Sequence, residues 1–204
     1  MIDDCTALIL AGGASRRMGR DKTRIELHEL QGKTLLQGCI DVMQPLFPRV
    51  LVSVAEFRDD IEVPQVYDEV ALQGPLAGVC AGLKAIATTW IFVVAGDMPF
   101  LKPALIERLA SFRGQGDAVV PLIDGFPQTL TAFYSCSTLP IFQSVFAGAG
   151  KHSFRAVLER LPVCYVDEKS LISVDAELRS FVDIDTPDDL LRIHHSPGEE
   201  RTLP

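Results

Sequence analysis

The sequence contains no long hydrophobic run, and none of its apolar stretches approaches the ~18 to 20 residues that a membrane-spanning helix needs. Its first four residues, MIDD, are acidic where a secretory signal peptide would be basic. Both features argue against export and against insertion into a membrane. We therefore expect a cytoplasmic protein.

Cysteine is scarce and scattered. The five cysteines are odd in number and include no C-x-x-C pair, which argues against a disulfide framework and against a cysteine-based zinc site. The four histidines show no metal-ligand spacing beyond the adjacent pair His194 and His195. This pattern fits a reducing compartment.

Positive charge is also in short supply. The chain has 19 Lys and Arg against 27 Asp and Glu, a formal net charge of −8, which argues against general nucleic-acid binding because phosphate backbones need a basic face. Yet five of the 19 basic residues lie between Arg16 and Arg24. This local concentration of charge needs an explanation.

The apolar residues that are present alternate between short runs and longer amphipathic stretches. Uninterrupted short runs are typical of strands covered on both faces, and their alternation with helices predicts an α/β fold with a three-layer, doubly wound, mostly parallel sheet. Strands are expected at 6–11, 50–54, 90–95, 118–123, 129–134, 163–166 and 181–183. Helices are expected at 34–46, 78–87, 103–112, 139–146, 153–161 and 187–193. We expect residues 1–194 to form a single domain and 195–204 to form a frayed tail.

The basic cluster follows a glycine pair at the end of the first expected strand. Ligands of open α/β sheets lie beyond the carboxyl ends of the strands, and Gly12 and Gly13 would let backbone N–H groups approach a phosphate closely. Arg16, Arg17 and Lys22 would then add mobile positive charge. The alternative is an ordinary strand-to-helix turn with a solvated basic stretch. The pattern matches neither the P-loop nor the dinucleotide-binding glycine fingerprint.

Two acidic positions lie in other loops of the expected fold. The run Gly96-Asp97-Met98-Pro99 directly follows the strand 90–95, and a carboxylate at Asp97 facing triphosphate oxygens would suit Mg²⁺. Alternatively, Asp97 forms the turn before Pro99. Asp68 precedes the loop GPLAG and either accepts hydrogen bonds from a nucleoside or is a solvated charge.

Together these segments resemble the molybdenum cofactor guanylyltransferase family, of the molybdopterin-guanine dinucleotide biosynthesis protein A type. The matching segments are LAGGASRRMGRDK, VYDE, GPLAG, GDMPFL and FVDIDTPDDL, in preserved order from Leu8 to Leu190. The resemblance implies a Rossmann-like nucleotidyltransferase fold. It also implies Mg²⁺-dependent transfer of GMP from GTP to molybdenum-bound molybdopterin, with release of pyrophosphate. A molybdenum insertase or a molybdoenzyme chaperone is an expected partner.

The resemblance also assigns roles to residues. Leu10, Ala11, Gly12 and Gly13 would wrap the nucleotide, Lys22 would contact its phosphates, Asp68 would hold the nucleoside, and Asp97 would bind both GTP and Mg²⁺. Because phosphate attack on phosphate needs charge neutralisation, Lys22, Arg17 and Asp97 are the candidate catalytic residues. No general base is required, since the attacking phosphate is already ionised.

The sequence departs from the family pattern at two places. Ser53 stands where many guanylyl relatives carry Asn, and it remains a candidate nucleotide contact. Asp183 and Asp185 stand in a D-I-D-T-P run that resembles cytidylyl relatives, either adding a metal ligand or, for Asp185 with Thr186, capping a helix. Gly12, where cytidylyl relatives have alanine, favours guanine.

A second ligand region is open to two interpretations. The segment 127–134, with Lys151, His152, Ser153 and Arg155, either receives the pterin and its phosphate or is an ordinary strand and helix N-terminus. Two other functions stay open. One is cytidylyl or other sugar- or cofactor-phosphate nucleotidyl transfer, and the other is nucleotide binding without turnover by a regulatory module.

Overall fold

A computed structural model describes residues 1–12, 21–67, 74–148, 152–184, 186 and 189. Within these residues an eight-stranded sheet forms the middle layer. Its strands are β1 (Cys5–Leu10), β4 (Arg49–Val54), β5 (Gln65–Tyr67), β6 (Trp90–Ala95), β7 (Ala118–Ile123), β8 (Phe126–Pro127), β9 (Thr131–Ser135) and β10 (Val163–Val166). The strand order is β10-β7-β9-β6-β1-β4-β5, and β8 pairs with β7.

The sheet is mostly parallel, with one reversed strand in its interior. β1 pairs in parallel with both β4 and β6, whereas β9 runs antiparallel to its neighbours β6 and β7. The strands expected at 90–95, 118–123 and 163–166 have the predicted bounds. The predicted doubly wound α/β fold is confirmed.

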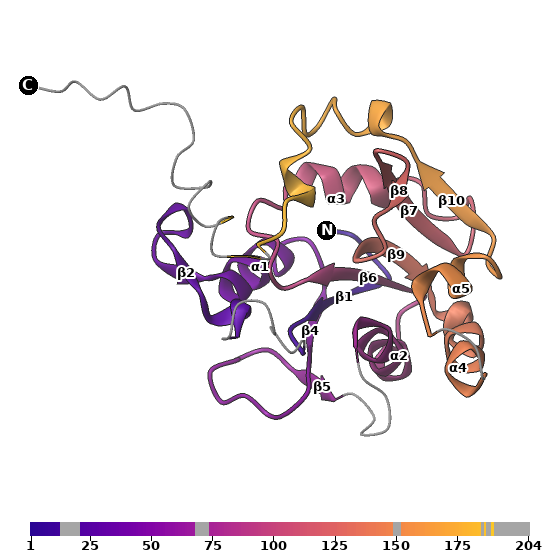
Figure 1. The fold of residues 1–204 in the computed structure, drawn as a ribbon, viewed down its shortest axis with the longest axis horizontal. Helices are drawn as coiled ribbons and strands as arrows, with labels where there is room; N and C mark the ends of the chain where they lie inside the picture. The colour runs from indigo at the N-terminus through magenta and orange to yellow at the C-terminus, as the bar shows by residue number, and fades with distance from the viewer. Residues whose placement is uncertain (13–20, 68–73, 149–151, 185, 187–188, 190–204) are drawn as a thin grey trace, which may run out of the picture.

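Helices cover both faces of the sheet (Figure 1). α1 (Leu35–Met43) and α3 (Pro103–Ala110) lie on one face, and α2 (Pro75–Ala85), α4 (Leu139–Ala147) and α5 (Phe154–Leu158) lie on the other. Successive β1 residues point to opposite faces, so that Ile9 joins the first core and Leu8 the second. Two buried cores therefore sandwich the central strands. No described helix is long and apolar enough to cross a bilayer.

Short elements connect the layers. A two-stranded sheet, β2 (Glu26–Leu27) with β3 (Lys33–Thr34), precedes α1, whose N-terminus is capped by the Thr34 hydroxyl accepting from the Gln37 N–H. The 3₁₀ turns are η1 (Lys22–Arg24), η2 (His28–Leu30), η3 (Cys136–Thr138), η4 (Glu168–Ser170) and η5 (Arg179–Phe181).

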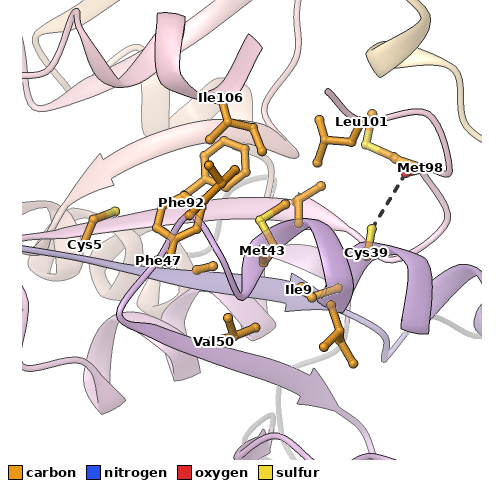
Figure 2. Packing of buried hydrophobic residues seen from close by; sticks show 14 of the residues in the cluster. Cys5, Ile9, Cys39, Met43, Phe47, Val50, Phe92, Met98, Leu101 and Ile106 are labelled. Carbon is orange, nitrogen blue, oxygen red and sulfur yellow. Dashed lines mark hydrogen bonds between the residues drawn. The ribbon is translucent and has the colours of Figure 1, made fainter. Parts of the chain in front are cut away.

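The first core extends directly beneath the turn that follows β6. Figure 2 shows Met98 and Leu101 packed beside Cys39 and Met43 of α1. The Cys39 thiol donates to the Met98 carbonyl at 3.8 Å and to the Ala95 carbonyl at 3.6 Å. The turn carrying Asp97 is therefore fixed from below by buried apolar side chains. All five cysteines are free thiols.

Among the expected elements whose bounds differ in the structure, two lie beside the ends of the central strands. α2 begins at Pro75 rather than 78, because Gly74 turns the chain with φ +98° and proline suits the first helical position. The prediction of a strand at 181–183 is wrong: η5 ends at Phe181, and the irregular chain after it makes a backbone bond from the Ile184 N–H to the Asp97 carbonyl. The helix expected at 187–193 lies outside the described residues.

Candidate functional site

A pocket opens at the carboxyl edge of the sheet, where β1, β4 and β6 end side by side. The Ala11 N–H donates to the Ser53 carbonyl at 2.8 Å, and the Gly96 N–H donates to the Leu10 carbonyl at 3.0 Å, so that the three strand ends are tied together. The pocket is lined by Leu10, Ala11, Gly12, Lys22, Thr23, Ser53, Gly74, Pro75, Gly78, Ala95, Gly96, Asp97 and Leu130. It occupies the position at which open α/β sheets bind ligands.

The structure brings most of the predicted site residues into this one pocket. Leu10, Ala11, Gly12, Lys22, Ser53 and Asp97 all line it. Gly13, Arg17 and Asp68, together with Arg16 and Asp185, lie outside the described residues.

Lys22 and Asp97 face each other across the pocket. The Lys22 Nζ lies 3.5 Å from Oδ2 of Asp97, and the two side chains are only 13% and 21% exposed. An ammonium and a carboxylate held this close, and partly withdrawn from water, interact more strongly than a surface pair. The arrangement places one positive and one negative group where a phosphorylated ligand would enter.

The Asp97 carboxyl is electrostatically strained. Burial raises its pKa above the ordinary value, and the nearby charge of Asp183 raises it further, against the opposing effect of the Lys22 ammonium. Asp183 is brought close because the next residue, Ile184, donates its N–H to the Asp97 carbonyl at 3.1 Å. A buried carboxyl with a second acid beside it favours a neutralising cation.

These two carboxylates fit a magnesium ion shared with a phosphate ligand. Mg²⁺ commonly uses one or two carboxylates and completes its shell with phosphate oxygens and water. Among the described residues, no group of three or more His, Cys, Asp or Glu is arranged to hold a metal. Asp97, with the charge of Asp183 near it, is therefore the described carboxylate that could hold such an ion together with a phosphate ligand.

Close packing explains two of the glycines. A Cβ on Gly78, in the first turn of α2, would lie 2.6 Å from the Ser53 Oγ and 2.8 Å from a Leu10 methyl. A Cβ on Gly12 would lie 3.2 Å from the Ala55 backbone nitrogen. The close approach of the chain at the end of β4 is thus sufficient to explain why residue 12 is a glycine. A link between Gly12 and guanine preference is not needed for that explanation.

Sequence reasoning missed several parts of the pocket. Thr23, Leu130 and the start of α2 line it, whereas the sequence pattern assigned Thr23 no role, marked the start of α2 only by the GPLAG motif and placed Leu130 in the second ligand region. A single threonine next to a predicted lysine carries no signal of its own. Leu130 enters because β9 inserts beside β6, a reversal that periodicity does not indicate.

Several residues of the second predicted ligand region make structural contacts, and Leu130 of the same segment lines the pocket. Tyr134 is fully buried, donates its hydroxyl to the Thr129 carbonyl at 2.9 Å and packs edge-on against Phe142; burial raises the pKa of its phenol. The Ser153 hydroxyl caps α5, and Arg155 pairs with Glu159 at 2.8 Å. His152 is exposed and lies beside Phe146. Lys151 lies outside the described residues.

Known proteins share this architecture over most of their length. A relative from Chloroflexus aggregans is 37% identical over 190 residues, covering 91% of each chain. One from Methanosarcina mazei is 33% identical, covering 91% of this chain and 88% of its own. Both carry the name probable molybdenum cofactor guanylyltransferase.

A solved structure gives the same result in three dimensions. The molybdopterin-guanine dinucleotide biosynthesis protein A from Archaeoglobus fulgidus superposes with a TM-score of 0.79 at 30% identity, covering 92% of this chain and 95% of its own. A family model described as the MobA-like NTP transferase domain matches residues 7–164. That range contains the three strand ends, α2, Lys22 and Asp97. The chain therefore belongs to the MobA-like NTP transferase domain family.

Proposed function

We propose that this protein transfers GMP from GTP to molybdenum-bound molybdopterin. An oxygen of the molybdopterin phosphate forms a bond to the α-phosphorus of GTP. The bond from that phosphorus to the oxygen bridging to the β-phosphate breaks, and pyrophosphate leaves with the bonding electron pair. The products are the molybdopterin guanine dinucleotide cofactor and pyrophosphate.

The observation that carries this proposal is the Lys22–Asp97 pair at the mouth formed by three strand ends. Lys22 supplies a compact positive charge for the triphosphate. The glycines of the pocket let the triphosphate approach the protein backbone closely, because they carry no Cβ. Bringing two anionic phosphates together costs electrostatic free energy, so positioning and charge neutralisation dominate the chemistry. The attacking phosphate is ionised at neutral pH, so it needs no side chain to remove a proton.

The carboxylates have a complementary part. Asp97, with Asp183 beside it, would hold Mg²⁺, which when bound supplies positive charge to the triphosphate. The two carboxylates by themselves would repel the nucleotide, and Lys22 offsets that repulsion on one side. Substrate affinity is therefore expected to depend on both the ammonium and the divalent cation.

The choice of guanine rests on the relatives, whose names specify guanylyl transfer at 37% and 33% identity. Gly12 agrees with it, but the close approach of Ala55 accounts for that glycine without reference to a base. Nucleotide preference therefore needs a direct measurement.

The test is pyrophosphate release from GTP, CTP, ATP and UTP, each with Mg²⁺ and molybdenum-loaded molybdopterin. We expect turnover with GTP, and a large but still measurable decrease of about 100- to 1,000-fold in Lys22→Ala and in Asp97→Ala. Lys33 and Asp41 form an ion pair outside the pocket, so Lys33→Ala and Asp41→Ala are matched controls that should retain activity. Preference for CTP would replace guanylyl by cytidylyl transfer, and GTP binding without turnover would indicate a binding module.

A further inference from the structure

A network of charged side chains lies behind Lys22, outside the pocket lining. At its centre is Arg58, in the connection between β4 and β5. The Arg58 Nη1 donates to Asp21 Oδ2 at 3.2 Å and to Thr23 Oγ1 at 2.7 Å. Its Nε and Nη2 donate to the two carboxylate oxygens of Asp60 at 3.1 and 2.7 Å. One guanidinium therefore contacts the residues on both sides of Lys22.

Arg58 is itself held firmly by the sheet. Its side chain is only 10% exposed, and its backbone is bracketed by Gln65 at the start of β5. The Arg58 N–H donates to Gln65 Oε1 at 3.0 Å, and Gln65 Nε2 donates back to the Arg58 carbonyl at 2.6 Å. The hydrogen bonds to Asp60 outweigh burial and raise the pKa of Arg58, while that of Asp60 is lowered. The pair is thus fixed and fully ionised.

The other end of the network shapes the turn that carries Lys22. Asp21 caps η1, its Oδ1 accepting from the Thr23 N–H at 3.0 Å and from the Thr23 hydroxyl at 2.7 Å. Thr23 is buried, and its methyl group lies 3.4 Å from where a Cβ of Gly96 would stand. The Lys22 backbone is therefore clamped between Arg58 and the turn that bears Asp97.

We propose that Arg58 is a positioning residue for nucleotidyl transfer, which acts through Asp21 and Thr23 to fix the backbone from which Lys22 reaches the phosphates. This rests on the proposed function. A lysine side chain is flexible and its charge is effective only near the correct atom, and a misplacement of about 1 Å costs roughly 100-fold in rate. Arg58 is absent from the pocket lining formed by the described residues, so it acts on the substrate through the turn of residues 21–23, from which Lys22 reaches the pocket.

Lysine cannot replace this arginine. Arg58 uses three nitrogens on three partners, with the Nε and Nη2 pair forming a fork on Asp60 and Nη1 reaching Asp21 and Thr23. A single ammonium lacks that planar geometry. Arg58→Lys should therefore behave much like Arg58→Ala, although it keeps the charge.

A double-mutant cycle with Lys22 tests the proposal. We expect Arg58→Ala to lower kcat/KM for GTP by about 10- to 100-fold, and to change it less than about threefold in the Lys22→Ala background, because the group it positions is then gone. Arg49→Ala, at the exposed amino end of β4, is the matched control and should leave kcat/KM unchanged. The proposal would be overturned if Arg58→Ala lowered kcat/KM by the same factor in the wild-type and Lys22→Ala backgrounds. It would also be overturned if Lys22→Ala alone left kcat/KM unchanged.

Two further measurements keep the result decisive. If Arg58→Ala does not fold, judged by circular dichroism, Asp60→Asn replaces it in the cycle, because Asp60 is partly exposed and holds Arg58 from the solvent side. If the wild type shows no turnover, the proposed function fails, and the cycle is repeated on the dissociation constant of the best-binding of the four nucleotides by calorimetry. Coupling to Lys22 in binding would then support the positioning role, and its absence would overturn it.

Discussion

The two charged sides of the pocket are built in different ways. On the acidic side, Asp97 lies on a turn fixed by main-chain bonds from Gly96 to Leu10 and from Ile184 back to Asp97, with Cys39 beneath it. On the basic side, Lys22 is fixed through ionised side chains. A turn held by backbone and core is hard to alter by single substitutions, whereas a charged network is sensitive to each member and to salt. One side of the site is rigid by construction and the other is adjustable.

The largest effect should come from removing the Asp97 charge without changing its shape. We expect Asp97→Asn to lower kcat about 1,000-fold, or ~4 kcal/mol of transition-state stabilisation. The same variant should unfold at a higher temperature than the wild type at pH 7, because burial and Asp183 penalise the ionised carboxyl. Steady-state kinetics test the decrease in kcat, and calorimetric melting tests the increase in unfolding temperature.

The pH dependence of that stability gain has a fixed sign. The pKa of Asp97 is raised in the folded protein, so the wild type carries the penalty at pH values above that raised pKa and loses it as the pH falls through it towards 3.8. The melting temperatures of wild type and Asp97→Asn should therefore converge in acid. If Asp97→Asn were less stable than the wild type at neutral pH, the ionised Asp97 carboxyl would not be destabilising the folded protein.

A smaller but still large effect should follow from breaking the anchor of the segment that carries Asp183. Asp175 is fully buried, accepts from the Ser180 N–H at 2.8 Å and pairs with Lys102 Nζ at 2.8 Å. Lys102→Met leaves this carboxylate buried without its cation, at a cost of about 3 kcal/mol in unfolding free energy by urea denaturation.

The double variant Lys102→Met/Asp175→Asn is the control for this anchor, and it should recover much of the lost stability. Burial opposes ionisation of Asp175, but hydrogen bonds from Lys102 and Ser180 outweigh it and lower its pKa. The stability from the pair is therefore present above the ordinary value of 3.8 and is lost as the pH falls through the lowered pKa. A loss from Lys102→Met that is unchanged in acid would argue against the ion pair as its cause.

Among the charged side chains around Lys22, the more exposed ones should contribute less to the free energy of unfolding. The Arg24 guanidinium is 54% exposed and lies 3.2 Å from Asp60 and 3.5 Å from Asp21. Arg24→Ala should cost about 0.2 to 1 kcal/mol of unfolding free energy at low salt and less at high salt. Urea denaturation at two ionic strengths measures this. A salt-independent cost would place Arg24 among the buried supports with Arg58.

The smallest effect is expected for the exposed ion pair of Lys33 and Asp41, which involves neither side of the pocket. Asp41→Asn should change the unfolding free energy by no more than about 0.5 kcal/mol. The same urea titration provides the baseline for the other variants. A larger change would mean that this pair supports α1 beyond its own contact.

The rigid side is also the side that sequence predicts best. A buried strand followed by Gly96 and Asp97 places a carboxylate at the sheet edge, since parallel strands end together, and Lys22 follows the β1 end by the same logic. Asp183 was harder to place, because the Phe-Val-Asp run at 181–183 is typical of a short strand, whereas the described segment docks through the backbone bond from the Ile184 N–H to the Asp97 carbonyl.

The adjustable side depends on contacts that a linear pattern does not encode. Asp21 and Arg58 are 37 residues apart and meet through loop conformations. The strand β5 was also missed, because three residues are too few to show a period. Tyr134 shows the converse, as a motif position that tertiary packing turned into core.

The reversed strand β9 has a consequence for the order in which the chain assembles. It fills the place between β6 and β7, so during synthesis from the N-terminus the apolar edge of β6 stays unpaired until Thr131–Ser135 has been made. Until then β1, β4 and β6 can pair, yet Leu130 cannot complete the pocket wall. In a nascent chain, β1, β4 and β6 are therefore complete before the strand that covers the β6 edge, and an unpaired strand edge of this kind is prone to aggregation.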